Sequence, residues 1–308
     1  MNEGSVAAVV VTWNRRTLLV EALRAIEGQS RPPHRVIVVD NASHDGTRAM
    51  LANEFAHLDV ISVHRNTGGA GGFAIGLQRA LSGGCDAVWL LDDDTIPEPG
   101  ALAALVDARH RYGGAPPALV ASRVVWTDGR DHPMNTPREK PGVSATERAA
   151  AATVGGVAIR SASFVSVLVD ASLVRERGLP VADYFLWNDD FEFTTRLIRG
   201  RRGIFCPASV VVHKTSTFGS TEADPGARFF YEVRNKVWLF ARSRGLSPVE
   251  KVVYGASTVR RWGRTIARSH DRATLWRGLQ RGLVAGFRTR PRSTTELIAA
   301  ATCDRDVW

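Results

Sequence analysis

The chain has 308 residues, of which 44% are hydrophobic and 23% charged, a balance typical of a globular protein and not of a disordered one. Its three cysteines lie far apart, which argues against a disulfide scaffold and favours a reducing compartment. We see neither a signal peptide nor an apolar run of about 18–20 residues, so we expect a cytoplasmic protein, or one bound peripherally to the cytoplasmic face of the plasma membrane.

The net charge of +9 is concentrated near the C-terminal end. Residues 226–308 carry 17 Lys and Arg against 6 Asp and Glu, a net charge of +11, so the preceding residues are slightly acidic. A basic segment of this kind favours binding to nucleic acid or to an anionic membrane surface.

The first half of the chain alternates apolar, strand-like runs with helical patterns. The first run is continuously apolar, which is typical of a strand buried on both faces of a parallel sheet. Repetition of the strand–helix unit predicts four βα steps and an α/β fold with a right-handed, mostly parallel sheet flanked by helices. The four predicted strands are residues 6–12, 36–40, 60–64 and 87–91.

The second half is less regular, and beyond Pro225 the pattern is helical to the end. Pro207 interrupts the last predicted strand, since proline cannot donate a hydrogen bond to a sheet. The predicted elements are strands at 119–126, 163–169 and 204–212, a loop-rich segment at 128–154, and a helix within 183–199.

Three adjacent aspartates, Asp92, Asp93 and Asp94, directly follow the fourth predicted strand. Their negative charges repel one another unless something neutralises them. Open α/β sheets bind ligands at the carboxyl ends of their strands, and carboxylate oxygens suit Mg²⁺ or Mn²⁺. The triplet therefore indicates a cation that carries a diphosphate, with a solvated acidic turn as the alternative.

A glycine-rich loop at residues 66–73 opens the helix after the third strand. Its backbone N–H groups, together with the helix N-terminus, can bind phosphate, and we expect Asn66, Gly68 and Gly69 to contribute to cofactor binding. The spacing is neither the dinucleotide fingerprint nor a P-loop. Close packing of the helix on a strand is the alternative role of these glycines.

Further candidates lie at the ends of the first two strands. Asp40 can accept hydrogen bonds from a nucleotide base or ribose, or it can cap the next helix. Thr12, Asn14 and Arg15 lie at the same edge of the predicted sheet. Arg15 offers a planar donor fork to a base edge or a phosphate, although a solvated surface arginine is the alternative.

Asp189, Asp190 and Glu192 form a second acidic cluster at the start of a predicted helix. Adjacent carboxylates can raise the pKa of one of them, which suits a general base that works near neutrality. The alternative is a favourable interaction of acidic residues with the helix dipole. His213 ends the last predicted strand and could join two aspartates in binding a hard metal ion.

In this order, the segments resemble the family 2 glycosyltransferases, which have a GT-A fold. Residues 66–73 and the Asp triplet are similar to the galactofuranosyl- and rhamnosyltransferase branch, above all to actinobacterial galactofuranosyltransferases that begin cell-wall galactan synthesis. The resemblance covers about residues 5–215 and rests on residues 10–15, 39–47, 91–94, 189–192 and His213.

The resemblance implies an inverting, metal-dependent enzyme that transfers galactofuranose from UDP-galactofuranose to a lipid-linked rhamnosyl-GlcNAc acceptor. Asp93 is expected to point away from the metal and to matter least there. The residues implied at the donor are Asp40 at the uracil with Thr12, Asn14 and Arg15 beside it, and Asp92, Asp94 and His213 at a Mn²⁺ or Mg²⁺ ion. Asp92 and Asp93 are also expected among the residues that bind the donor.

The resemblance also implies the catalytic and acceptor residues. Asp190 aligns with the catalytic base of the family, and Trp187 lies where an aromatic ring could stack on an acceptor sugar. Asn188, Asp189 and Asp190 stand where many relatives have a Glu-Asp pair, so Asp189, expected to contribute to acceptor binding, remains an alternative base.

We expect a GT-A catalytic domain at residues 1–225, followed by a helical basic C-terminal region at 226–308. The nucleotide-binding half of the catalytic domain would be about 1–115 and the acceptor half about 116–225. In the basic region, Trp276, Leu279, Leu283 and Phe287 recur at helical spacing between arginines. This pattern favours peripheral membrane contact over nucleic acid, with packing on the catalytic domain or on another subunit of a homo-oligomer as the alternative.

Other functions stay open at this point. A rhamnosyltransferase would use dTDP-rhamnose, whose base presents a similar pyrimidine edge. A nucleotidyltransferase would be expected to carry a basic, glycine-rich loop directly after the first strand, which residues 12–15 do not resemble. A non-catalytic nucleotide- or nucleic-acid-binding protein has no need of both acidic clusters.

Overall fold

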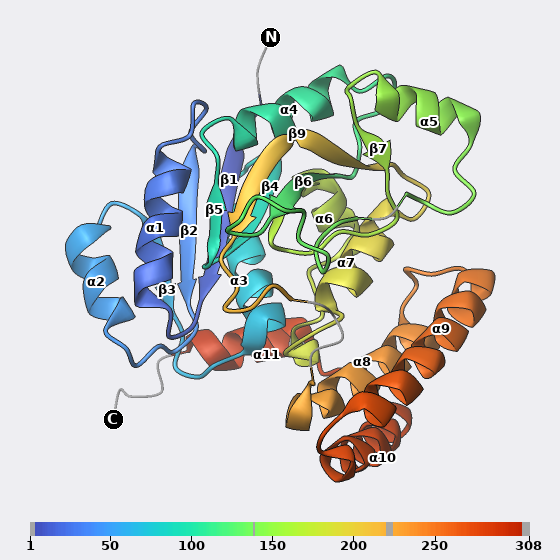
Figure 1. Ribbon diagram of the computed structural model, residues 1–308. Coiled ribbons are helices and arrows are strands. Elements are labelled where there is room, and N and C mark those ends of the chain that lie inside the picture. Colours follow the sequence, from blue (N-terminus) through green and yellow to red (C-terminus); the bar gives the residue numbers. More distant parts are fainter. Residues whose placement is uncertain (1–3, 138, 220–223, 304–308) are drawn as a thin grey trace.

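The computed structural model describes residues 4–137, 139–219 and 224–303 (Figure 1). These residues form a nine-stranded sheet in the order β3-β2-β1-β4-β8-β6-β9-β5, with β7 paired to β9. The strands are β1 (Val6–Thr12), β2 (Arg35–Asp40), β3 (Asp59–Ser62), β4 (Ala87–Asp92), β5 (Thr95–Pro97), β6 (Leu119–Val125), β7 (Val157–Ala158), β8 (Ser166–Asp170) and β9 (Gly203–His213).

Two hydrophobic cores lie on opposite faces of the sheet, between the strands and the helices. Val9 and Val11 of β1 point into one core, and Ala8 and Val10 point into the other. The helices are α1 (Arg16–Glu27), α2 (Thr47–Glu54), α3 (Gly68–Ser82), α4 (Ala101–Arg111), α5 (Ala145–Ala152), α6 (Ala171–Arg177), α7 (Asp189–Ile198), α8 (Phe229–Arg242), α9 (Pro248–Arg268), α10 (Arg272–Arg288) and α11 (Thr294–Thr302), with short 3-10 turns η1 (Ala182–Tyr184) and η2 (Gly226–Arg228).

The four strands predicted in the first half pair in parallel, which confirms the βα repeats. The second half of the sheet is mixed, because β8 runs antiparallel to both β4 and β6, while β6 and β9 are parallel. Pro207 does not end β9. The pairing of β9 with β6 instead shifts register between Ser122 and Arg123, so the strand continues to His213.

Residues 128–154, predicted to be loop-rich, are mostly irregular but also contain the helix α5, which was not predicted. The Ser144 hydroxyl accepts a hydrogen bond from the backbone N–H of Glu147 at 3.1 Å and caps this helix. The alanine-rich sequence that follows has high helix propensity, and Lys140 Nζ donates to Glu147 Oε1 at 2.9 Å. The cap and the alanines together explain a helix within an otherwise irregular segment.

Helices α8, α9 and α10 form a bundle beside the sheet, whereas α11 returns to pack against α3 (Figure 1). Glycines on α10 allow a close approach to α8, since a Cβ atom on Gly282 would lie 2.7 Å from that of Val233. No helix among the described residues is long and apolar enough to cross a membrane.

The apolar stripe predicted on the basic region is divided between two environments. Leu279 and Leu283 pack against the core of the bundle. Trp276 is 54% exposed and Phe287 is 68% exposed. Only part of the stripe therefore serves packing within the chain, and two aromatic rings stay on the surface.

Candidate active site

The carboxyl ends of β1, β2 and β4 meet at one edge of the sheet, as the parallel pairing requires. Thr12 lies opposite Asp40 across β1 and β2, and Val11 lies opposite Asp92 across β1 and β4. Asp92 ends β4, and Asp93 and Asp94 form the turn between β4 and β5. The predicted donor and metal residues of these strands therefore lie side by side.

Asp92, Asp94 and His213 lie close enough together to bind one cation. One ligand atom from each residue lies within 4.8 Å of the other two. The pairing of β5 with β9 sets Thr95 opposite His213 and so brings the histidine to the triplet. His213 Nε2 lies 3.1 Å from Asp94 Oδ1, and its Nδ1 lies 3.0 Å from Asn135 Oδ1, so the ring is oriented from both sides.

The electrostatics of this cluster favour a positive ligand. Burial, reinforced by the charge of Asp94, raises the pKa of Asp92 to about 7. Burial alone would lower the pKa of His213, but the hydrogen bond and charge of Asp94 raise it. Arg15 was predicted beside the uracil, and its guanidinium donates to Asp94. Two carboxylates that already attract a cation, with an imidazole beside them, fit a hard divalent metal ion.

Asp93 turns away from this group and toward β1. Its Oδ2 accepts hydrogen bonds from Thr12 Oγ1 at 2.8 Å and from the backbone N–H of Trp13 at 3.3 Å. Burial raises the pKa of Asp93 to about 6. Thr12 and Asp93 therefore fix the triplet against the end of β1.

Asp40 is fully buried at the end of β2. Its Oδ1 accepts from the backbone N–H of Ser43 at 3.0 Å, whereas its Oδ2 has no hydrogen-bond partner among the residues that the structure describes. A buried oxygen without a partner is costly, so this atom is suited to accept an N–H of a ligand. Asn14 Oδ1 accepts from the backbone N–H of His44 at 2.7 Å, which ties the end of β1 to the loop after β2.

The glycine-rich loop forms the first turns of α3, and its glycines have different surroundings. A Cβ atom on Gly72 would clash with Val11 of β1, so this glycine allows α3 to pack closely on the strand. A Cβ atom on Gly68, whose φ is +71°, would clash with the backbone of Phe185. Gly69 faces open space, and Asn66 Oδ1 accepts from the N–H of Gly68 at 2.7 Å. The loop thus packs closely against the segment that precedes α7.

The second acidic cluster lies at the start of α7, and its two aspartates differ. Asp189 is 8% exposed, and burial together with the charges of Asp190 and Asp92 raises its pKa well above the ordinary value. The two acidic clusters therefore lie within electrostatic reach of each other. Asp190 is half-buried, its Oδ1 accepts from the N–H of Phe191 at 2.6 Å, and burial raises its pKa as well.

Trp187 and Glu192 flank the two aspartates. The guanidinium of Arg228 lies 5.4 Å from the ring centroid of Trp187, which is half-buried. Glu192 Oε1 accepts from Arg196 Nε at 2.9 Å and from Ser243 Oγ at 2.8 Å. Glu192 is thus bound within the fold, which leaves Asp189 and Asp190 as the candidates of this cluster for the predicted base.

Helix α8 holds the loop in front of α7, a contribution that was not predicted from the sequence. Asn235 is fully buried, and its Nδ2 lies 2.9 Å from each of three backbone carbonyl oxygens in that loop. Backbone conformations with positive φ are costly for residues other than glycine, and these hydrogen bonds stabilise them. The carbonyls belong to Tyr184, Leu186 and Trp187, and the residues with φ of 64–65° are Phe185, Trp187 and Asn188.

Glu232 and Lys236, one turn apart on α8, bring one charge to the loop before α7 and one to the first turn of α7. Glu232 Oε2 accepts from Asn188 Nδ2 at 2.7 Å. Lys236 Nζ lies 4.6 Å from the ring centroid of Phe191, and burial lowers its pKa to about 8 against the opposing charges of Glu232 and Asp190. The polar run at residues 234–236 inside an apolar helix is the sequence feature that indicates buried polar side chains here.

The sequence profile of Glycosyl transferase family 2 matches residues 7–164. The chain belongs to this family and is a glycosyltransferase with a GT-A fold, as the sequence predicts. It is similar to galactofuranosyltransferase GlfT1 of Mycobacterium tuberculosis, with 31% identity over 256 residues that cover 77% of this chain and 83% of that protein.

Two solved structures share the fold at low sequence identity. S. aureus TarS 1-349 in complex with UDP-GlcNAc has a TM-score of 0.59 and 16% identity, and the match covers 91% of this chain and 81% of that one. Mannosyltransferase PcManGT from Pyrobaculum calidifontis, in complex with GDP-Man and Mn²⁺, has a TM-score of 0.54 and 19% identity, with 92% and 86% covered.

Proposed function

We propose that this enzyme transfers galactofuranose from UDP-galactofuranose to a lipid-linked rhamnosyl-GlcNAc acceptor in cell-wall galactan synthesis. The likeness to GlfT1 over most of both chains carries the choice of donor. In addition to burial, the charge of Asp92 contributes to the raised pKa of Asp189, so the two acidic clusters interact electrostatically. This proximity supports a site in which a donor and an acceptor meet.

On the donor side, Asp92, Asp94 and His213 would hold Mn²⁺ or Mg²⁺, which would neutralise the charge that develops on the departing UDP. The unpartnered Oδ2 of Asp40 accepts an N–H of the uracil. Arg15 can pair with the diphosphate once Asp94 is engaged with the cation, since a guanidinium binds phosphate through two parallel hydrogen bonds.

On the acceptor side, Asp190 removes the proton of the attacking hydroxyl, and the attack inverts the anomeric carbon. Asp190 suits this role better than Asp189 because it is more exposed, and burial raises its pKa toward the range of an effective base. Trp187 provides an aromatic face for the acceptor sugar.

We also propose that residues 1–225 form the catalytic domain, with a nucleotide-binding half at about 1–115 and an acceptor half at about 116–225. The basic region at 226–308 would attach the enzyme to the cytoplasmic face of the membrane. The exposed rings of Trp276 and Phe287 among arginines support this attachment.

A panel of nucleotide sugars tests the proposal. The protein is incubated with a rhamnosyl-GlcNAc lipid and UDP-galactofuranose, UDP-galactopyranose or dTDP-rhamnose, with and without Mn²⁺, and the product is identified by mass spectrometry. We expect metal-dependent transfer from UDP-galactofuranose alone. Transfer from dTDP-rhamnose alone would overturn the proposal in favour of a rhamnosyltransferase, and no transfer from any of the three donors would overturn both choices of donor.

A further inference from the structure

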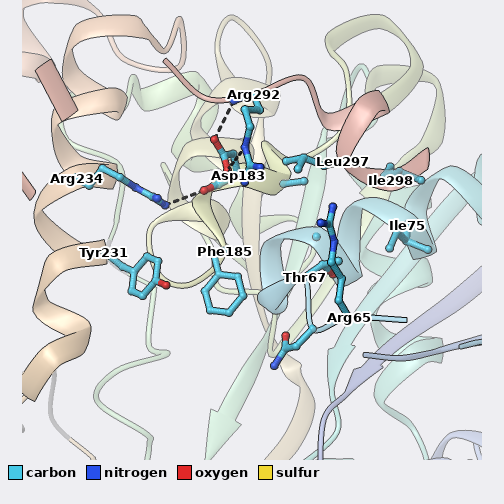
Figure 2. Close-up of a pocket in the computed structure, with 13 residues that line it drawn as sticks. Arg65, Thr67, Ile75, Asp183, Phe185, Tyr231, Arg234, Arg292, Leu297 and Ile298 are labelled. Carbon is cyan, nitrogen blue, oxygen red and sulfur yellow. Dashed lines mark hydrogen bonds and ion pairs between the residues drawn. The ribbon is translucent and has the colours of Figure 1, made fainter. Parts of the chain in front are cut away.

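A cavity of about 240 Å³ lies where the glycine-rich loop, the loop before α7, α8 and α11 meet (Figure 2). Three arginines, Arg65, Arg234 and Arg292, line it together with the carboxylate of Asp183. Neither the three proposed metal ligands nor Asp40 belongs to its lining. The cavity is therefore distinct from the Asp triplet and Asp40, although Asn66 of the glycine-rich loop, which was predicted to contribute to cofactor binding, belongs to its wall.

The carboxylate of Asp183 is already matched by one arginine. Arg292 Nη2 and Nε donate to Asp183 Oδ1 at 2.6 and 3.1 Å, and the backbone N–H of Arg292 donates to Oδ2 at 2.9 Å. Although burial would raise the pKa of Asp183, the hydrogen bonds from Arg292 hold it below the ordinary value. Asp183 thus fixes Arg292 at the cavity wall, as the dashed contacts in Figure 2 show.

Neither of the other two arginines, Arg65 and Arg234, forms an ion pair with a carboxylate of the described residues, so their positive charges are not neutralised. Arg234 Nη2 donates to the backbone carbonyls of Asp183 and Tyr184 at 2.7 and 3.1 Å, and its guanidinium lies 5.2 Å from the ring centroid of Tyr231. Arg65 is exposed and forms no ion pair with another residue of the described ranges. The cavity thus has an excess of positive charge, which an anion can neutralise.

We propose that this cavity binds the phosphate or diphosphate group through which the glycan acceptor is joined to its lipid. The volume is below the roughly 300–1,000 Å³ of pockets that hold a whole small ligand, so it suits one charged group. Phe185 in its wall belongs to the loop that leads to Trp187 and Asp190, which relates the cavity to the acceptor side. The choice of acceptor rests on the proposed function, whereas binding of phosphate does not.

The first test measures anion binding without turnover. Inorganic pyrophosphate is titrated calorimetrically into the protein in EDTA, so that no metal ion can bind it at the Asp triplet. We expect binding to the wild type and an affinity about tenfold lower in Arg65→Glu, because a charge-assisted contact is lost. Arg111→Glu, at an exposed arginine at the end of α4, should behave as the wild type. Equal affinity in Arg65→Glu, or no binding to the wild type, would overturn the phosphate site.

The second test separates acceptor from donor. The KM is measured for a lipid-linked acceptor that contains phosphate and for the same glycan on a phosphate-free alkyl chain. In Arg65→Glu the ratio of the first KM to the second should rise about tenfold. An unchanged ratio with a tenfold loss of UDP affinity would assign the cavity to the donor and overturn the acceptor assignment. If the wild type turns over neither acceptor, the proposed function fails while the pyrophosphate result stands.

Discussion

Asn235 of α8 donates a hydrogen bond to the backbone carbonyl of Trp187 at 2.9 Å. The donor lies in the basic C-terminal region, and the acceptor lies two residues before the start of α7. The bundle is therefore coupled directly to the loop that carries the proposed acceptor and base residues. Removing this hydrogen bond should therefore lower kcat more than it lowers the affinity for the donor.

Asn235→Ala should lower kcat about 10- to 100-fold while UDP affinity changes less than twofold, because the loop loses the hydrogen bonds that hold its left-handed residues. Steady-state kinetics and calorimetry with UDP check this split. Asn53→Ala, at an exposed position of α2, is the matched control. An unchanged kcat with a lower melting temperature would limit Asn235 to a role in stability.

Lys236→Met should shift the acidic limb of the kcat/KM profile to higher pH. Asp190 must be ionised to act as a base, and the positive charge of Lys236 favours its ionised form. Activity therefore rises as the pH increases through the raised pKa of Asp190. Without the positive charge of Lys236 this pKa is higher still, so the rise in activity should occur at a higher pH. A profile that superimposes on that of the wild type would contradict this role.

The same substitution should make the fold more stable at neutral pH. Burial lowers the pKa of Lys236 from 10.5 to about 8, so the folded state disfavours the charged lysine. This penalty is fully present below pH 8 and disappears above about pH 10.5. Lys236→Met should therefore raise the free energy of unfolding at pH 7 by up to about 3 kcal/mol, and urea denaturation at pH 7 and pH 10.5 measures the difference.

Mn²⁺ affinity should fall as the pH drops below about 7. Protons compete with the cation at Asp92, whose pKa is about 7, and at His213, whose pKa is raised. EDTA should abolish transfer, and Asp94→Asn should weaken Mn²⁺-dependent UDP binding at least tenfold. Asp107→Asn, an exposed position on α4, serves as the control. Transfer that persists in EDTA would contradict the metal site.

Trp276 and Phe287 should mediate binding to anionic lipid. Replacing both by serine removes the exposed rings and should reduce flotation with anionic liposomes at least tenfold. The double substitution Val249→Ser and Val252→Ser on the exposed face of α9 is the control. It tests whether removing other exposed apolar side chains reduces liposome binding equally. A wild-type protein that stays unbound to anionic and neutral liposomes alike would contradict membrane attachment.

The sequence predicted the first half of the fold well, because β1, β2 and β4 are continuous apolar runs that end in polar residues. Parallel pairing then brings Thr12, Asp40 and Asp92 to one edge without further information. The mixed half was less predictable, since β8 enters the sheet between β4 and β6 and no local pattern encodes that crossover. Helix α5 depends on a serine cap and a short alanine-rich run within an otherwise irregular segment.

The candidate site, too, could be predicted only in part from the local sequence. Asp92, Asp94 and His213 could be grouped from residue chemistry, but the Arg15 contact with Asp94 depends on side-chain positions. The roles of Asn235 and Lys236 depend on how α8 packs against a loop about fifty residues earlier in the chain. Local sequence carries little information about such long-range contacts.

The most direct test of the central claim compares Asp190→Ala with the wild type. Transfer from UDP-galactofuranose to the rhamnosyl-GlcNAc lipid is measured together with Mn²⁺-dependent UDP binding. We predict that kcat falls about 10²- to 10⁴-fold while UDP affinity stays near that of the wild type, and that Asp189→Asn loses less activity. Loss of UDP binding together with activity in Asp190→Ala, or transfer at the wild-type rate, would contradict the assignment of Asp190 as the base.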